Sequence, residues 1–176
     1  TLLSNKAPVF LARYTRGLES DRGDFAFHAL AFAMKHSFSA FRGGKATFQL
    51  FAGGNDRSLP RSRMRVYRSN FAKGNFSELP GAFNTMRYDE FASDLYAEAF
   101  LYLSPRLRWL HLGKRIQPRL HISMAAAWGS LYPSSLSRAA PFILQAPRNI
   151  YLEPGLVLTH FLPSPKIDNF AVSLIR

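Results

Sequence analysis

Charged side chains recur at alternate positions in two consecutive segments, residues 91–103 and 115–128. The set comprises two carboxylates followed by three basic groups: Asp94, Glu98, Arg115, Arg119 and His121. Paired carboxylates can act as acid and nucleophile in hydrolysis. Because arginines on the adjacent segment would neutralise them here, we favour a charge network in a polar lumen over catalysis. A selectivity or gating site is the functional alternative for the same network.

Other kinds of chemistry find little support in the sequence. The five histidines are scattered without ligand spacing, and there is no cysteine to form a disulfide, a thiolate zinc site or a nucleophile. The glycine pairs at 43–44 and 53–54 lack the spacing of a phosphate-binding loop and are interpreted as turns. We therefore predict a protein that is not an enzyme, with no catalytic residue, no metal site and no cofactor.

The segments that carry the charged residues alternate in the manner of two-faced β-strands. In residues 91–103 and 115–128, one parity is nearly all apolar and the other is mostly polar. Residues 45–53 also alternate, and a glycine turn joins them to the long strand-like segment 24–38, which predicts a hairpin. Further strands are expected at three places: residues 8–16, 149–162 and 167–176. The sequence thus predicts an all-β chain of about seven strands.

Strand length and composition indicate a membrane setting. The segment 24–38, about 14 residues, is long for a soluble strand of roughly 5–6 residues and sufficient for a tilted membrane strand of roughly 9–11. Hydrophobic residues make up 47% of the chain, yet the mean hydropathy is -0.10, so apolar and polar residues are interleaved. No apolar run reaches the roughly 20 residues of a spanning helix. Any membrane crossing is therefore expected to use strands.

Loop lengths alternate along the chain. Long loops are expected at residues 55–88 and 130–148, and short turns at 43–44, 105–113 and 163–165. Outer-membrane barrels alternate long external loops with short periplasmic turns in this way. We predict one domain over residues 1–176: the C-terminal part of an antiparallel transmembrane β-barrel. Single-chain barrels have an even number of at least 8 strands, so we expect an N-terminal part of the same barrel, or another chain, to complete it.

The net charge of +12 points to an acidic partner. Several arginines of the first long loop alternate with apolar and aromatic residues: Arg57, Arg61, Arg63, Arg65 and Arg68. Basic residues interleaved with aromatics can bind single-stranded nucleic acid, so a soluble all-β nucleic-acid-binding protein is the rival hypothesis. No ribonucleoprotein motif, zinc finger or helix-turn-helix pattern accompanies them. We favour an external loop whose arginines face lipopolysaccharide phosphates, and we expect no nucleic-acid partner.

Residues 83–102, FNTMRYDEFASDLYAEAFLY, carry a resemblance to a known family. The matching pieces are Phe83-Asn84-Thr85-Met86, Glu90-Phe91, Ser93-Asp94 and Tyr96, supported by PVFLARYTRG at 8–17, YLEPGLVL at 151–158 and NFAVSLIR at 169–176. The chain resembles the C-terminal barrel of Bacteroidota outer-membrane proteins that carry an N-terminal carboxypeptidase-like regulatory domain. The function of that barrel domain is unknown. The resemblance covers nearly the whole chain.

This family is distantly similar to the assembly and translocation barrels of the surface-antigen superfamily, in which a long external loop folds into the lumen. The resemblance implies that an arginine of the 55–88 loop pairs with an acidic wall residue: Arg87 as the arginine, with Asp94 or Glu98 as its partner. The Met-Arg-Tyr sequence around Arg87 departs from the Arg-Gly pair typical of that superfamily. The chain ends in Arg176 without a terminal aromatic residue, and we expect the barrel's own C-terminus further on.

We therefore expect an integral protein of the bacterial outer membrane with a transport, translocation or assembly-related role. A structural anchor without a conducting lumen is the alternative. The expected partners are outer-membrane lipid, lipopolysaccharide and the remainder of the barrel, and membership of a membrane protein complex is left open.

Overall fold

The computed structural model describes residues 7–18, 26–40, 44–57, 64–68, 81–86, 90–105, 119–133, 145–159 and 169–171. Every element in these residues is a strand, which confirms the all-β prediction. The strands are β1 (Val9–Gly17), β2 (Phe27–Ala40), β3 (Gly44–Asn55), β4 (Arg65–Val66), β5 (Ala92–Ser93), β6 (Leu95–Ser104), β7 (Arg119–Ser130), β8 (Tyr151–Thr159) and β9 (Asn169–Ala171). In this part of the chain, no helix is long and apolar enough to cross a membrane.

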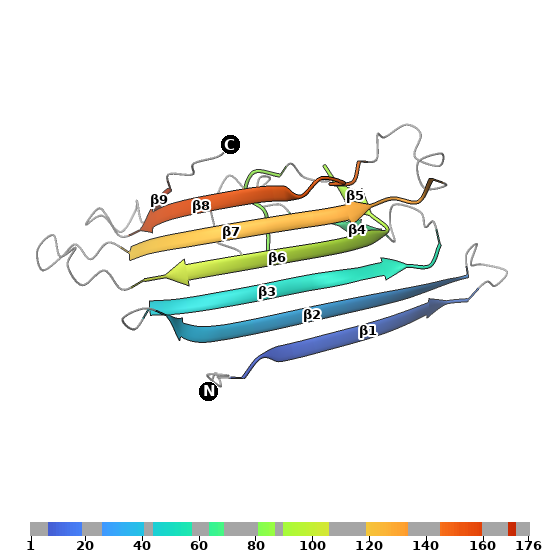
Figure 1. Ribbon diagram of the computed structural model, residues 1–176, viewed down its shortest axis with the longest axis horizontal. Helices are drawn as coiled ribbons and strands as arrows, with labels where there is room; N and C mark the ends of the chain where they lie inside the picture. Colours follow the sequence, from blue (N-terminus) through green and yellow to red (C-terminus); the bar gives the residue numbers. More distant parts are fainter. Residues whose placement is uncertain are drawn as a thin grey trace, which may run out of the picture.

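The longer strands form one curved antiparallel sheet (Figure 1). Its seven strands are ordered β1-β2-β3-β6-β7-β8-β9, and β4 pairs with β5 in a separate two-stranded sheet. Each strand of the large sheet follows its neighbour in the chain except where β4 and β5 are inserted between β3 and β6. Among the described residues, β1 and β9 each pair on one side only, so the sheet does not close into a barrel.

Over the described residues, the predicted strands agree with the structure except that β4 lies within the predicted loop 55–88 and that one predicted strand is divided. Residues 91–103 were expected to form a single strand, but the structure divides them at Asp94 into β5 and β6. The Asp94 carboxylate accepts a hydrogen bond from the backbone N–H of Tyr132 at 2.9 Å, and its carbonyl accepts one from the N–H of Asn55 at 3.1 Å. These contacts tie Asp94 to the ends of β3 and β7, and β5 turns away to pair with β4. Parts of four predicted strands lie outside the described residues: 24–25, 115–118, 160–162, and 167–168 with 172–176.

The register separates the side chains of the large sheet into two faces, because successive side chains of a strand point to opposite sides. The outer face presents, among others, a large set of apolar side chains: Phe10, Leu30, Phe32, Phe38, Leu95, Ile122, Met124, Trp128, Leu152 and Leu156. All of these are solvent-exposed, with Leu30 at 62% and Met124 at 50%. This arrangement confirms the parity predicted for the parts of these segments that form β6 and β7, whereas Ser93, predicted on the apolar face, is buried in β5.

The inner face is more polar and carries the core. Residues 64–68 and 81–86, here called the inner loop, pack on the inner face over β3, β6, β7 and β8. The core is built from aromatic, methionine and alanine side chains of the inner loop and of the large sheet, here called the wall: Tyr67, Phe83, Met86, Phe100, Ala125 and Ala127. Phe83 is 0% exposed, and its ring centroid lies 4.9 Å from that of Phe100. The segment predicted as a long loop therefore supplies much of the hydrophobic core.

Candidate functional site

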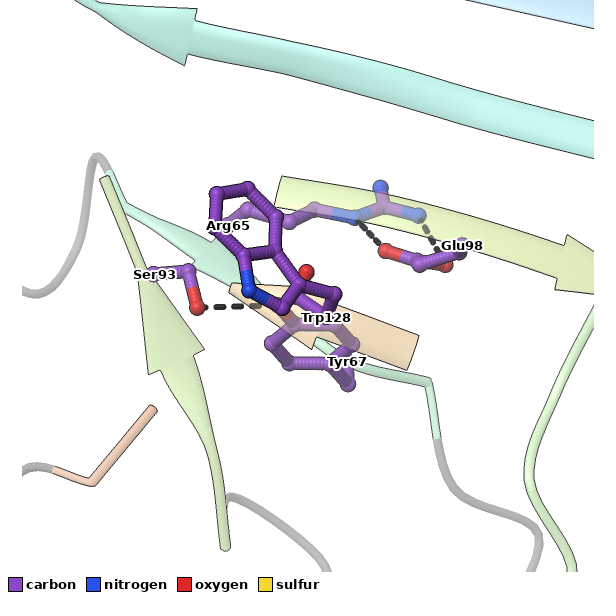
Figure 2. Close-up of polar contacts among 5 residues, drawn as sticks. All are labelled: Arg65, Tyr67, Ser93, Glu98 and Trp128. Carbon is purple, nitrogen blue, oxygen red and sulfur yellow. Dashed lines mark hydrogen bonds and ion pairs between the residues drawn. The ribbon is translucent and has the colours of Figure 1, made fainter. Parts of the chain in front are cut away.

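An ion pair joins the inner loop to the wall. Arg65 of β4 reaches Glu98 of β6 with two hydrogen bonds, Nε to Oε1 at 2.7 Å and the second guanidinium nitrogen to Oε2 at 3.0 Å. Figure 2 shows the two groups facing each other in this fork-to-fork arrangement. Glu98 is 1% exposed, so its charge depends on this partner for solvation.

Aromatic rings complete the environment of the Arg65 guanidinium. The guanidinium carbon Cζ lies 5.2 Å from the ring centroid of Tyr96 and 5.7 Å from that of Phe51, within the range of cation–π attraction. Burial lowers the pKa of Arg65, but the hydrogen bond and the charge of Glu98 outweigh burial and leave the pKa raised. Arg65 therefore stays protonated in a site that lies between the loop and the sheet.

A second contact lies beside this ion pair, centred on the hydroxyl of Tyr67. This hydroxyl donates to the carbonyl of Trp128 at 3.0 Å, and it lies 2.8 Å from Oγ of Ser93 (Figure 2). Because the single phenolic proton goes to Trp128, Ser93 is the donor in the other bond. Space here is tight: a Cβ added to Gly129 would lie 2.2 Å from the Tyr67 hydroxyl and 2.1 Å from Ser93 Oγ.

Gly129→Ala is therefore expected to lower the free energy of unfolding by about 1–3 kcal/mol, because overpacking forces the Tyr67 ring or the strand to shift. Urea unfolding of the purified protein measures this loss. Adding Tyr67→Phe removes the clashing oxygen, so the double variant should lose less than the sum of the two single losses. Strict additivity would mean that Tyr67 does not limit the space at Gly129.

The same tyrosine gives a pH signature. Burial raises the pKa of Tyr67 to about 12, with the nearby Glu98 charge acting in the same direction and the Ser93 hydrogen bond opposing it. A raised tyrosine pKa favours the protonated form in the folded state. Its contribution to stability is therefore complete below pH 10, the ordinary tyrosine pKa, and is lost as the pH rises to about 12.

Titration of tyrosinate absorbance checks this prediction. The difference between the wild-type curve and the Tyr67→Phe curve should be one ionisation near pH 12. A difference centred near pH 10 would show that Tyr67 is solvated in the folded protein.

Glu153 of β8 holds the other part of the inner loop. Its carboxylate accepts hydrogen bonds from the backbone N–H of Asn84 at 2.7 Å and of Thr85 at 3.0 Å, and from Thr85 Oγ1 at 2.7 Å. The Thr85 hydroxyl also contacts the Tyr151 hydroxyl at 2.5 Å. The carboxylate thus replaces water for two backbone donors that an irregular segment leaves without partners.

Gly81 fixes the start of this segment. Its N–H donates to the Tyr102 hydroxyl at 2.9 Å, and its φ of 83° lies in the left-handed region that glycine occupies without strain. Together with Glu98 and Glu153, Tyr102 gives the wall three polar anchors that grip one loop. These contacts hold the inner loop against the sheet through Glu98, Glu153 and Tyr102.

The described residues of the predicted lumen network do not all lie together, and Arg115 lies outside the described residues. Glu98 is opposite Ala127 in the sheet, whereas Arg119 lies at the far end of β7, so strand register separates this acid from that base. His121 hydrogen-bonds to Ser104 Oγ at 2.9 Å, and Asp94 accepts a hydrogen bond from the backbone N–H of Tyr132. The predicted opposition of carboxylates and arginines on adjacent strands is therefore wrong for Glu98 and Arg119.

The arginine that meets the acidic wall also differs from expectation. Arg65 was assigned to a lipopolysaccharide-facing loop, but its guanidinium is turned inward to Glu98. Arg57 and Arg68 are exposed. Four other candidate residues lie outside the described residues: Arg61, Arg63, Arg87 and Arg115. Sequence analysis missed Tyr67 and Glu153, although Glu153 falls on the same parity of its predicted strand as Tyr151.

Comparison with known proteins yields no relative: no protein-family model matches the chain, and no curated protein or solved structure is similar to it. Within the described residues, no group of three or more His, Asp or Glu side chains is arranged to hold a metal ion.

Proposed function

We propose that this chain is the C-terminal wall of an integral outer-membrane β-barrel, of the Bacteroidota family that it resembles, with a transport, translocation or assembly-related role. The observation that carries the proposal is the outer face, where exposed apolar side chains extend across β1, β2, β6, β7 and β8. Soluble proteins seldom expose contiguous apolar patches of such extent. A lipid environment would bury this face without any further protein.

The inner face supports the same proposal. It carries the hydroxyl, amide and charged groups of the wall, which matches the polar interior and apolar exterior of a membrane barrel. In the proposed barrel, the inner loop lies in the lumen and acts as a plug that Glu98 and Glu153 hold in place. The open edges of the sheet would be paired by further strands, because unpaired backbone groups in lipid each cost several kcal/mol.

Membrane fractionation of the full-length protein, with gel mobility compared before and after boiling, tests the proposal. We expect the protein in the outer-membrane fraction, with a mobility that changes on heating as a closed barrel unfolds. A protein that is soluble without detergent and shows no change in mobility would contradict the barrel. Salt-dependent nucleic-acid binding would then be the next test.

A pair of arginine substitutions at neighbouring positions of β2 distinguishes the two faces. Met34 lies on the outer face near the middle of the strand, and Ala33 lies beside it on the inner face. We expect Met34→Arg to lower the free energy of unfolding in bilayers by about 2–4 kcal/mol, the cost of a charge near the lipid midplane. Ala33→Arg is the matched control and should cost less. Equal costs would argue against lipid contact on the outer face.

The packed inner loop also favours a second candidate, a structural anchor whose lumen does not conduct. Tyr67, Phe83 and Met86 are buried between loop and wall, so the loop is a folded part of the domain. Ion conductance of the reconstituted protein separates the two candidates, since an anchor with a permanently filled lumen passes no current.

A further inference from the structure

Three basic residues lie on the inner face away from the inner loop. Arg13, Lys35 and Lys45 occupy the inner parity of β1, β2 and β3, as their strand partners show. All three are exposed.

The acidic groups of this face are already engaged. Glu98 is paired with Arg65, and Glu153 accepts three hydrogen bonds from the inner loop. In the part of the chain that the structure describes, no carboxylate forms a salt bridge with Arg13, Lys35 or Lys45. Among the described residues, the charge that remains uncompensated on the inner face is therefore positive.

The three cations are evenly spaced along the strands. Arg13 is level with Ala31 of β2, Lys35 is itself on β2, and Lys45 is level with Ser39. The three levels on β2, residues 31, 35 and 39, are four residues apart, which is about 13 Å at roughly 3.3 Å per residue. The positive groups thus extend from the long-loop end of the sheet to the short β2–β3 turn.

Small side chains leave room beside these cations. On β2, the inner position beside Arg13 is Ala31, and the inner positions between the cations are Ala33 and Ser37. The inner loop packs further along the sheet, against residues of β3, β6, β7 and β8. On β1, Leu11 belongs to the inner parity and is 64% exposed, so no described residue covers this part of the wall.

We propose that Arg13, Lys35 and Lys45 form a cationic ladder that guides small anions along the lumen side of β1–β3. This inference rests on the proposed function and specifies its substrate class as anionic solutes. A channel lined by one sign of charge between low-dielectric walls concentrates the oppositely charged ion. Several moderate sites in sequence, rather than one tight site, allow an ion both to enter and to leave.

Ion selectivity of the full-length protein in planar lipid bilayers tests the ladder. The reversal potential in a potassium chloride gradient gives the ratio of chloride to potassium permeability. We expect a chloride preference in the wild type, and a ratio at least about twofold lower in Arg13→Gln/Lys35→Gln, because two of the attractive charges are removed. Arg16→Gln is the matched control: Arg16 is also exposed on β1 but belongs to the outer face, so the preference should persist.

Each result decides between the two proposals. A cation preference, or an unchanged ratio in the Arg13→Gln/Lys35→Gln variant, would overturn the ladder and leave the barrel standing. The measurement is repeated in the Glu98→Gln background. This variant is expected to loosen the inner loop, so ion selectivity can be measured even if the loop closes the lumen of the wild type. A heat-modifiable protein that conducts in neither background would overturn the ladder and favour the structural anchor. A protein without heat-modifiable mobility would overturn the barrel itself, and the ladder with it.

Discussion

Glu98→Gln is expected to lower the free energy of unfolding by about 3 kcal/mol and to loosen the inner loop, because removing one partner of a buried pair leaves the other charge uncompensated. Glu98 is almost completely buried, while Arg65 retains some contact with solvent, so the loss belongs at the lower end of the range for buried pairs. Urea unfolding measures the loss of stability. Protease cleavage within residues 55–90 measures the release of the loop.

A double-mutant cycle controls this experiment. If the loss comes from the uncompensated charge, Arg65→Gln/Glu98→Gln should be more stable than the sum of the single losses predicts. The coupling between Arg65 and Glu98 would then be large. Additive losses would show that the ion pair in the structure contributes no coupling and that Glu98 acts through packing alone.

Phe83→Ala is expected to have the largest effect of any single substitution proposed, a loss of about 3–5 kcal/mol, because it opens a cavity at a site that cannot collapse. The ring of Phe83 is fully buried and packs against Phe100, Tyr151 and Tyr67 from three other segments. Equilibrium unfolding of the protein in detergent or bilayers gives this value.

The matched control is Phe38→Ala on the outer face, where the ring is 45% exposed in the protein alone. Lipid would remain in contact with this position after truncation, so we expect a loss well below that of Phe83→Ala. Losses of the same size would mean that the inner loop adds no more stability than an exposed ring on the outer face. The inner loop would then not be the core of this domain.

The sequence was sufficient to predict the sheet because period-two alternation is a local signal. The faces of β6 and β7 could be assigned from the spacing of Glu98, Phe100, Met124 and Trp128 alone. The break at Asp94 could not, since it depends on hydrogen bonds with Tyr132 and Asn55. Those partners are distant in sequence and become neighbours only after the strands have paired.

The type of contact at the candidate site could be predicted, but the arginine that makes it could not. The resemblance implied that an arginine of the long loop meets an acidic wall residue, and Arg65 does contact Glu98. Nothing local distinguishes Arg65 from the other arginines of its segment, because the choice depends on how the inner loop packs over Phe51 and Tyr96. The prediction that Glu98 and Arg119 lie opposite each other was wrong for a similar reason. The register of β6 and β7 is fixed by the whole sheet, not by one segment.

The insertion of the inner loop between β3 and β6 has a consequence for biogenesis. These two strands pair with each other, yet the chain between Asn55 and Leu95 must leave the sheet and return before their ladder can form. Closing so long a loop carries a greater entropic cost than closing the short β2–β3 turn. The β1–β2–β3 meander can therefore pair early, whereas β6 can join β3 only after the intervening segment has returned to the sheet. Until then β3 presents a long unpaired edge, which is open to pairing with another chain.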